Sequence, residues 1–231
     1  MNKIAIITGA SGNLGQSVVK KFIDEGFNVV GTVHKYIPSE GLQAGNYHPI
    51  ELDLMNEDDS QKLVSDAIVK YGSIDVAVLT AGGFAMGDIA ATKTNDIYKQ
   101  YQLNFETAYN IARPVFIQMM KQNNGRIFLI GSQAGLDVSK SKGVTAYALS
   151  KSLIFRLAEL MNAESKDKNV VTSVVVPGTI DTPQNRESMP GANFSSWETP
   201  QQIADIIYQY STSEAAKLEE VVIKIYNKSR L

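Results

Sequence analysis

The 231-residue sequence has no cysteine and only two histidines, His34 and His48. Without cysteine the chain can form no disulfide, thiolate nucleophile or cysteine-ligated zinc or iron–sulfur site. Two histidines do not support a histidine-rich metal site, so we predict no metal. Basic residues show no excess, because 22 Lys and Arg stand against 24 Asp and Glu. Nucleic-acid-binding domains usually carry such an excess, so we expect no nucleic-acid partner.

Long apolar runs are also absent. No stretch approaches the roughly 20 apolar residues that cross a bilayer, so we expect no membrane partner. The first residues lead into a strand-like segment without the regions of a signal peptide, which predicts a cytoplasmic protein. Hydrophobic residues make up 44% and charged residues 20% of the chain, close to globular averages. The length suits a single domain spanning residues 1–231.

Strand-like and helical segments alternate along the chain. Residues 3–8 are apolar and rich in β-branched side chains, which predicts a strand buried on both faces. Further strands are predicted at 28–33, 50–54, 75–79, 126–130, 170–176 and 220–226. Helices are predicted at 16–25, 58–71, 95–122, 145–166 and 199–210. This alternation predicts an α/β fold, a single-domain Rossmann-type, doubly wound, mostly parallel seven-stranded sheet with helices on both faces.

Two segments interrupt this alternation. Residues 36–49 and 181–200 lack clear periodicity, and the second is rich in turn-forming residues. A long loop inside a compact domain is often functional, commonly as a lid. We therefore predict that residues 181–200 form an irregular substrate lid.

A glycine-rich turn lies between the first predicted strand and the first predicted helix. Its spacing is G-x-x-G-x-x-G, at Gly9, Gly12 and Gly15, with Ser11, Asn13 and Leu14 between them. Glycines there let the backbone approach a pyrophosphate, and the helix N-terminus adds N–H groups and a favourable dipole. The strand–turn–helix context favours dinucleotide binding, and a tight turn without a ligand is the alternative.

The end of the second strand bears on the choice of dinucleotide. An acidic residue there would bind the ribose hydroxyls and oppose a 2′-phosphate. The sequence has no acid at this point, but His34 and Lys35, which could meet a 2′-phosphate. This favours NADP(H) as the cofactor. NAD(H), with the two residues in a solvated loop, is the alternative.

Residues 147–151 read Tyr-Ala-Leu-Ser-Lys and open the helix after the fifth strand. Tyr147 and Lys151 share one helix face, and a nearby ammonium is expected to lower the pKa of a phenol toward neutral pH. The pattern also occurs by chance, and the alternative is a half-buried tyrosine beside a solvated lysine. Its expected place at the carboxyl ends of the strands favours a catalytic pair.

These motifs, in this order, resemble the short-chain dehydrogenase/reductase family over nearly the whole chain. The resemblance implies that Tyr147 donates a proton, that Lys151 also holds the nicotinamide ribose, and that Ser132 hydrogen-bonds the reacting oxygen. Asn104 would hold a water in a proton relay behind Lys151. The other implied cofactor contacts are Asp53, Leu54, Ala81, Gly82, Gly83, Pro177, Gly178, Ile180 and Thr182. Each of these residues alone also has an ordinary structural interpretation.

Three features depart from the commonest family pattern: the glycine spacing, Thr80 in place of asparagine, and the absence of a C-terminal glycine pair. The chain resembles one branch, the quinonoid dihydropteridine reductases, in these features, in residues 81–84 and in segment 181–197. That resemblance implies a substrate site containing Phe84, Met189 and Trp197. That branch has no counterparts of Ser132 and Asn104, and a serine at this position fits carbonyl chemistry better.

The sequence thus predicts an NAD(P)H-dependent oxidoreductase that transfers hydride from nicotinamide to a small carbonyl or quinonoid dihydropterin-like substrate. The alternative is a non-catalytic NADP(H)-sensing binding protein. The helices predicted at 95–122 and 145–166 carry more apolar residues than one core can bury, for example Leu149, Leu153 and Leu160. Together with the family resemblance, this predicts a homodimer or homotetramer.

Overall fold

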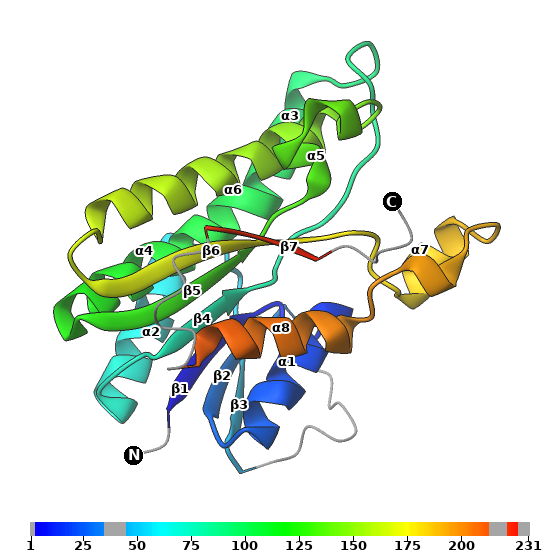
Figure 1. Ribbon diagram of the computed structural model, residues 1–231. Coiled ribbons are helices and arrows are strands. Elements are labelled where there is room, and N and C mark those ends of the chain that lie inside the picture. The colour runs from blue at the N-terminus through cyan, green and yellow to red at the C-terminus, as the bar shows by residue number, and fades with distance from the viewer. Residues whose placement is uncertain (1–2, 35–44, 213–220, 226–231) are drawn as a thin grey trace.

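The computed structural model describes residues 3–34, 45–212 and 221–225, which form a seven-stranded parallel sheet with helices on both faces (Figure 1). The predicted fold class is confirmed. The strands are β1 (Ile4–Thr8), β2 (Asn28–Val33), β3 (Tyr47–Glu51), β4 (Val76–Leu79), β5 (Asn124–Ile130), β6 (Asn169–Pro177) and β7 (Val222–Ile225). The helices are α1 (Asn13–Asp24), α2 (Glu57–Tyr71), α3 (Thr94–Tyr101), η1 (Gln102–Glu106), α4 (Thr107–Gln122), α5 (Gln133–Leu136), η2 (Val138–Lys140), α6 (Thr145–Glu164), α7 (Pro183–Ser188), η3 (Phe194–Ser196) and α8 (Pro200–Ser211).

The order of the strands reverses between β1 and β4. The sheet runs β3-β2-β1-β4-β5-β6-β7, so the chain winds outward in one direction from β1 and in the other from β4. The two strands pair in parallel as far as Thr8 and Leu79. Their carboxyl ends are therefore adjacent, and a crevice outside such a switch point is where open α/β sheets bind ligands.

Two apolar cores fix this arrangement, one on each face of the sheet. On one face, α2, α4 and α6 bury residues such as Leu63, Ile111 and Ile154. On the other, α1 and α8 bury residues such as Phe22 and Ile203. The strands face apolar layers on both sides, which explains the near-continuous hydrophobicity that marked them in the sequence.

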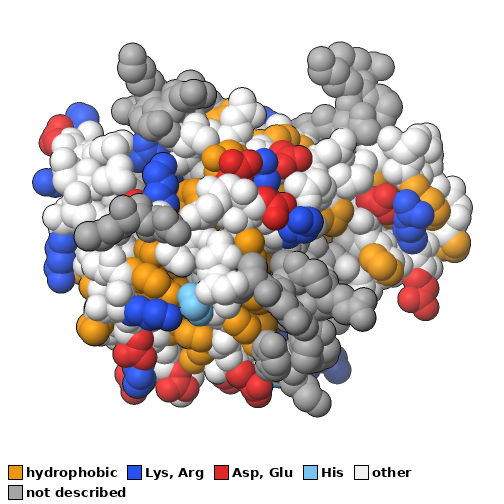
Figure 2. Space-filling view, turned by 90° about the horizontal axis from the view of Figure 1, so that it is seen from below, with side chains coloured by type: hydrophobic (Ala, Val, Ile, Leu, Met, Phe, Trp, Pro, Cys, Tyr) orange, Lys and Arg blue, Asp and Glu red, His pale blue; other side chains and the backbone are white. Residues whose placement is uncertain are grey.

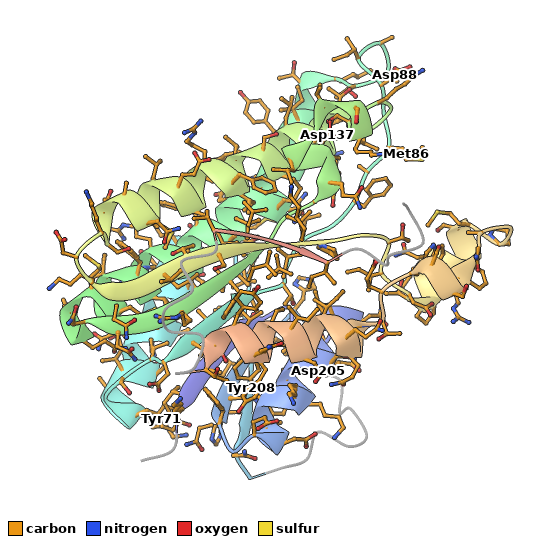
Figure 3. The ribbon with its side chains drawn as sticks, viewed as in Figure 1. Tyr71, Met86, Asp88, Asp137, Asp205 and Tyr208 are labelled. Atoms are coloured by element: carbon orange, nitrogen blue, oxygen red, sulfur yellow. The ribbon has the colours of Figure 1, made fainter. Side chains whose placement is uncertain are left out.

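The helices α1 and α8 are also joined at their outer surface. The Lys21 ammonium contacts Glu25 at 2.7 Å and Asp205 at 3.4 Å, and it lies 4.7 Å from the centre of the Tyr208 ring. Figure 3 labels Asp205 and Tyr208 on α8, the helix that follows the predicted lid. Such exposed pairs add little stability individually, so the apolar contacts between α1 and α8 are the main determinant of their packing.

Three predicted elements differ from the structure. The third strand begins at Tyr47 and includes Pro49, because an edge strand can accommodate a proline without losing a ladder bond on its outer side. The predicted helix 95–122 is divided by the π-helical turn η1. The segment 181–200 is not irregular throughout, because it contains α7 and η3.

Charged side chains of both signs are interspersed with apolar ones on the face seen in Figure 2. Among the described residues, no helix is long and apolar enough to span a bilayer. Nor do those residues contain a group of three or more His, Asp or Glu side chains that could hold a metal ion.

Candidate active site

Tyr147, Lys151 and Ser132 converge at the carboxyl end of β5. Ser132 lies two residues after the end of β5 and caps α5, its Oγ accepting a hydrogen bond from the Ala134 N–H at 3.1 Å. Its hydroxyl is close enough to that of Tyr147, in the first turn of α6, to influence the pKa of the phenol. Lys151 follows one turn later, is 6% exposed, and donates from Nζ to the Ile130 carbonyl at 2.8 Å. The structure thus brings together three residues that the sequence proposed as catalytic.

Burial dominates the electrostatics of the pair. It raises the pKa of Tyr147 above its ordinary value, and the hydrogen bond with Ser132 acts in the opposite direction. Burial also lowers the pKa of Lys151 to about 8. The expectation that the lysine would lower the tyrosine pKa is wrong in this state. The ammonium lies 6.0 Å from the centre of the Tyr147 ring and bonds the Ile130 carbonyl, while desolvation disfavours the phenolate.

Asn104 lies in the π-helical turn η1 and is 1% exposed. Its Oδ1 accepts from the Gly83 N–H, and its Nδ2 donates to the Gly83 carbonyl, both at 3.0 Å. Nδ2 also lies within hydrogen-bonding distance of Gln100 Oε1 at 3.0 Å and Ser150 Oγ at 3.2 Å. The side chain therefore fastens the turn after β4 to α3 and α6. Its role in a proton relay stays a prediction.

The turn that Asn104 holds has little room beside it. Gly82 has φ +157°, and a Cβ placed there would lie 2.6 Å from Asn104 Oδ1 and 3.5 Å from Lys151 Nζ. Ala81 is joined to the end of β1 by its N–H, which donates to Thr8 Oγ1 at 3.2 Å, and Thr80 Oγ1 donates to the Thr8 carbonyl at 2.6 Å. Thr80 thus links β1 and β4 where the family commonly has asparagine.

The glycine-rich turn lies beside this junction. The Gly12 N–H donates to the Gly9 carbonyl at 2.9 Å, which closes the turn before α1. Gly12 is the N-cap of α1 and provides no side-chain cap, and the first turn carries no acidic residue. Of the other residues predicted to contact the cofactor, Ser11 and Asn13 are exposed. Leu14 and Gly15 are buried in the first turn of α1.

The predicted adenosine side of the cofactor site is described in part. His34 is exposed directly after β2, and Lys35 lies outside the described residues. Asp53 is exposed, and its Oδ1 accepts from the Met55 N–H at 3.0 Å. The Leu54 side chain packs in the core, and its carbonyl accepts from Asn110 Nδ2 at 2.9 Å. The backbone after β3 is therefore held firmly, and the roles of these residues in cofactor binding stay predictions.

The segment after β6 leads into the predicted lid. Pro177 ends β6, Gly178 follows, and Ile180 forms a parallel bridge with Glu198 at the far end of the lid. Thr182 caps α7, its side chain accepting from the Asn185 N–H at 3.2 Å. The two ends of the lid are thus joined, so that residues 181–197 form a closed loop.

The three predicted substrate residues differ in their surroundings. Phe84 is 63% exposed, and its ring meets that of Tyr147 edge-on at 5.0 Å between centroids. Met189 is exposed at the end of α7. Trp197 is buried and packs against Phe194, which is covered in turn by the Arg186 guanidinium. Phe84 adjoins the Tyr147 site, whereas Trp197 contributes to the interior of the lid.

Three further residues of this region, Gln100, Ser150 and Glu198, were not predicted from the sequence. The first two contact Asn104 across helices, and Glu198 lies against Gly178. Spacing gave a partial signal only for Gln100, which lies four residues before Asn104 on a helical path. The contacts of Ser150 and Glu198 join elements that are far apart in the sequence.

Comparison with known proteins fits this geometry. A family model for short chain dehydrogenases matches residues 3–193. The chain belongs to the short-chain dehydrogenase family. It is 27% identical over 238 residues to the 3-oxoacyl-[acyl-carrier-protein] reductase FabG of Thermotoga maritima, covering 96% of each chain. It is also 25% identical over 236 residues to the dihydropteridine reductase of Dictyostelium discoideum, covering 100% of this chain and 97% of the relative.

Solved structures of short-chain dehydrogenases share the fold. The structure described as ElxO with NADP bound superimposes with a TM-score of 0.88 at 24% identity, covering 97% of each chain. Membership of this family makes the protein an NAD(P)-dependent oxidoreductase. The predicted family and enzyme class are confirmed.

Proposed function

We propose that the protein uses NAD(P)H to reduce a small carbonyl compound, with Tyr147 as the proton donor. The observation that carries this proposal is the placement of Tyr147 and the buried Lys151 one turn apart on α6, next to Ser132 at the carboxyl end of β5, whose last carbonyl accepts from Lys151 Nζ. Two hydroxyl groups that meet at one point can hold an oxygen on which negative charge develops. The similarity to a 3-oxoacyl reductase supports a carbonyl substrate.

The residues at the switch point fit a dinucleotide. The N-caps of α2, α7 and α8 each supply a side-chain oxygen, from Asn56, Thr182 and Thr199. By contrast, α1 begins at Gly12 without a side-chain cap, so its first N–H groups can bind an anionic oxygen. Gly9, Ser11, Asn13 and the turn at Ala81–Gly83 would hold the pyrophosphate and ribose. His34 favours NADP(H) because it follows β2 in place of an acid.

When bound, the reduced nicotinamide supplies the hydride. Tyr147 donates its hydroxyl proton to the substrate oxygen, and the Ser132 hydroxyl hydrogen-bonds that oxygen and positions it. The raised pKa of Tyr147 keeps the phenol protonated at neutral pH, as a proton donor requires. Lys151, whose pKa is lowered to about 8, still carries its charge there and can bind a ribose hydroxyl.

A quinonoid dihydropterin is the second candidate substrate. The Phe84 ring against Tyr147 offers an exposed aromatic surface on which a planar ring could stack. The relative from Dictyostelium, a dihydropteridine reductase, aligns over the whole chain. In this reading Met189 and Trp197 shape the lid over the ring, and Ser132 is not decisive for the chemistry.

The test follows oxidation of NADPH and NADH by near-ultraviolet absorbance, with a quinonoid dihydropterin and several small ketones and aldehydes assayed in parallel. Turnover of carbonyls alone would support the first candidate, and turnover of the pterin alone would reject it in favour of the second. Tyr147→Phe should lower kcat at least a hundredfold while cofactor binding persists. Undiminished turnover in that variant would overturn the mechanism.

We also propose that the protein assembles as a homo-oligomer through α4 and α6. Leu149, Leu153 and Leu160 on α6 are each at least 39% exposed, and Ile117 on α4 is 41% exposed. A groove of about 860 Å³ beside α6 adds the apolar side chains of Ile89, Leu136 and Val138. A second copy would remove this surface from water. Light scattering at micromolar concentration measures the mass, and a monomer would contradict the proposal.

A further inference from the structure

Gln100 is a buried glutamine near the end of α3 to which the proposed mechanism gives no role. It is 7% exposed and lies one turn before Asn104, which is 1% exposed. Burying a side-chain amide costs free energy unless it is hydrogen-bonded, so such a residue is normally held by specific polar contacts. Gln100 Oε1 accepts a hydrogen bond from Asn104 Nδ2 at 3.0 Å. Gln100 therefore belongs to the polar contacts around Asn104.

These contacts fix the orientation of the Asn104 amide. The Gly83 N–H is a donor, so the Asn104 atom that faces it at 3.0 Å is Oδ1. Nδ2 then faces three acceptors, which are the Gly83 carbonyl and Gln100 Oε1 at 3.0 Å each and Ser150 Oγ at 3.2 Å. An amide nitrogen carries only two hydrogens. The Gly83 carbonyl takes one of them, so Gln100 and Ser150 share the other.

Ser150 extends this contact to the segment that carries Tyr147. The Ser150 hydroxyl has one hydrogen, which it donates to the Tyr147 carbonyl at 2.8 Å. Its oxygen therefore serves as the acceptor for Asn104. Ser150 is 2% exposed, which shields both bonds from bulk water. The first turn of α6 is thus connected through Ser150 and Asn104 to Gln100 on α3.

The Asn104 amide also adjoins the other parts of the proposed site. The backbone that it binds leads directly into Phe84, whose ring meets that of Tyr147 at 5.0 Å between centroids. A Cβ placed on Gly82 would lie 2.6 Å from Asn104 Oδ1 and 3.5 Å from Lys151 Nζ, so the amide and the ammonium flank the same glycine. A shift of the amide would therefore move groups that must be aligned for reduction, and small misalignments lower the rate of such a step.

We propose that Gln100 is a positioning residue for the reduction. By sharing one Asn104 hydrogen with Ser150, it keeps the amide turned toward Gly83 and holds the loop after β4 in register with Tyr147. The proposal rests on the proposed function, which makes Tyr147 the proton donor, and Gln100 itself transfers no proton. Because either acceptor can bind the shared hydrogen, each partly substitutes for the other. Loss of both leaves a buried N–H unpaired, which is much more costly.

The first test measures the contact without any activity. Hydrogen exchange of the Gly83 N–H is followed by NMR on the full chain. Gln100→Met removes the acceptor and keeps the length of the side chain, and exchange should become about threefold faster. Combined with Ser150→Ala, it should become about fiftyfold faster, since one hydrogen then has no acceptor. Gln102→Met, at an exposed glutamine of η1, is the matched control and should leave the exchange rate unchanged.

The second test measures kcat for reduction with saturating NADPH. Gln100→Met and Ser150→Ala should each lower kcat about threefold, and the double variant about fiftyfold, more than the product of the two single effects. Gln100→Glu retains an acceptor oxygen at the same position and should keep kcat within about twofold of the unaltered protein. If the double variant does not fold, the contrast between Gln100→Met and Gln100→Glu decides the proposal.

Three results would overturn the proposal. Losses in the double variant that equal the product of the single losses would show that Gln100 and Ser150 share no hydrogen. A lower unfolding temperature in Gln100→Met, with Gly83 exchange and kcat unchanged, would show that Gln100 only supports packing. Equal losses in Gln100→Met and Gln100→Glu would assign the effect to something other than the acceptor. Failure of the unaltered protein to turn over any carbonyl or pterin would instead reject the proposed function, and the exchange rates would still test the contact itself.

Discussion

The rings of Phe84 and Tyr147 meet edge-on, with their centroids 5.0 Å apart and their planes inclined by 72°. Phe84 comes from the loop after β4 and Tyr147 from α6, and a bridge between Gly87 and Val144 ties the two segments together close by. Because Phe84 remains largely exposed, its free face can receive a substrate beside the proposed proton donor.

Phe84→Ala should raise KM for a planar ring substrate about tenfold and change kcat less than threefold, since an aromatic contact is worth about 1 kcal/mol beyond area burial. Steady-state kinetics with the quinonoid dihydropterin measure both constants. Met86→Ala, which removes another exposed side chain of the same loop, is the control and should leave KM within twofold. Figure 3 labels Met86 on this loop. An unchanged KM in Phe84→Ala would exclude Phe84 from the substrate site.

The pH dependence of reduction should follow Lys151. Its pKa is lowered to about 8 by burial, so the ammonium is lost above that pH while Tyr147, with a raised pKa, remains protonated. We expect kcat/KM for reduction to fall above about pH 8, measured as initial rates from pH 6 to 10. Lys151→Arg keeps its charge throughout this range, so any residual activity it has should show no such fall. If kcat/KM of Lys151→Arg falls in the same way above pH 8, the fall belongs to the titration of another group.

Burial of Lys151 should also appear in stability. Between pH 8 and 10.5 the unfolded chain holds a proton on this lysine that the folded chain has released. The free energy of unfolding should therefore rise with pH across that window, relative to a Lys151→Met variant. Urea unfolding at pH 7.5 and pH 10 gives both values. A difference between the two proteins that does not vary with pH would contradict the lowered pKa.

Gly82→Ala should destabilise the protein by about 2 to 4 kcal/mol and weaken cofactor binding, because the new Cβ would lie 2.6 Å from Asn104 Oδ1. Thermal unfolding and cofactor titration measure the two effects. Gly26→Ala is the matched control: Gly26 also has positive φ, at +81°, but no atom within 4 Å of the added Cβ. It should lose only about 1 kcal/mol. Equal losses of stability in Gly82→Ala and Gly26→Ala would show that the backbone conformation, and not the contact with Asn104, determines the cost.

His34→Asp should reverse the proposed cofactor preference. An exposed acid directly after β2 would repel a 2′-phosphate and accept hydrogen bonds from ribose hydroxyls. We expect the ratio of the NADPH to the NADH dissociation constant to rise at least tenfold in calorimetric titrations. His34→Asn, which adds no charge, should change the ratio much less. A ratio unaffected by the acid would place the 2′ position elsewhere.

Leu153→Glu should convert the proposed oligomer to a monomer. Leu153 is 39% exposed on the outer face of α6, and a buried unpaired charge at an interface costs several kcal/mol. Light scattering at matched concentrations measures the mass. Val69→Glu, at an 85% exposed residue on α2, is the control and should leave the mass unchanged. A persistent oligomer in Leu153→Glu would place the interface on another face.

Most of the sheet could be predicted because buried parallel strands have a simple signature. Most residues in the runs at 28–33 and 126–130 are apolar, so burial on both faces could be predicted without the fold. The π-helical turn around Asn104 could not be predicted, because its residues continue the helical pattern of the segments on both sides. The pKa of Tyr147 was predicted in the wrong direction because spacing reports a neighbouring lysine but not how much water both groups lose.

The sequence by itself determined the order of strands and helices, the glycine-rich turn and the spacing of Tyr147 and Lys151, because these depend on neighbours along the chain. Only the tertiary structure decided that Ser132 meets Tyr147, that Asn104 binds the Gly83 backbone and that Glu198 lies against Gly178. These contacts join segments 15 to 21 residues apart, and the sheet and its covering helices bring them together. The packing of the two cores sets the positions of these residues, and no local sequence pattern predicts that packing.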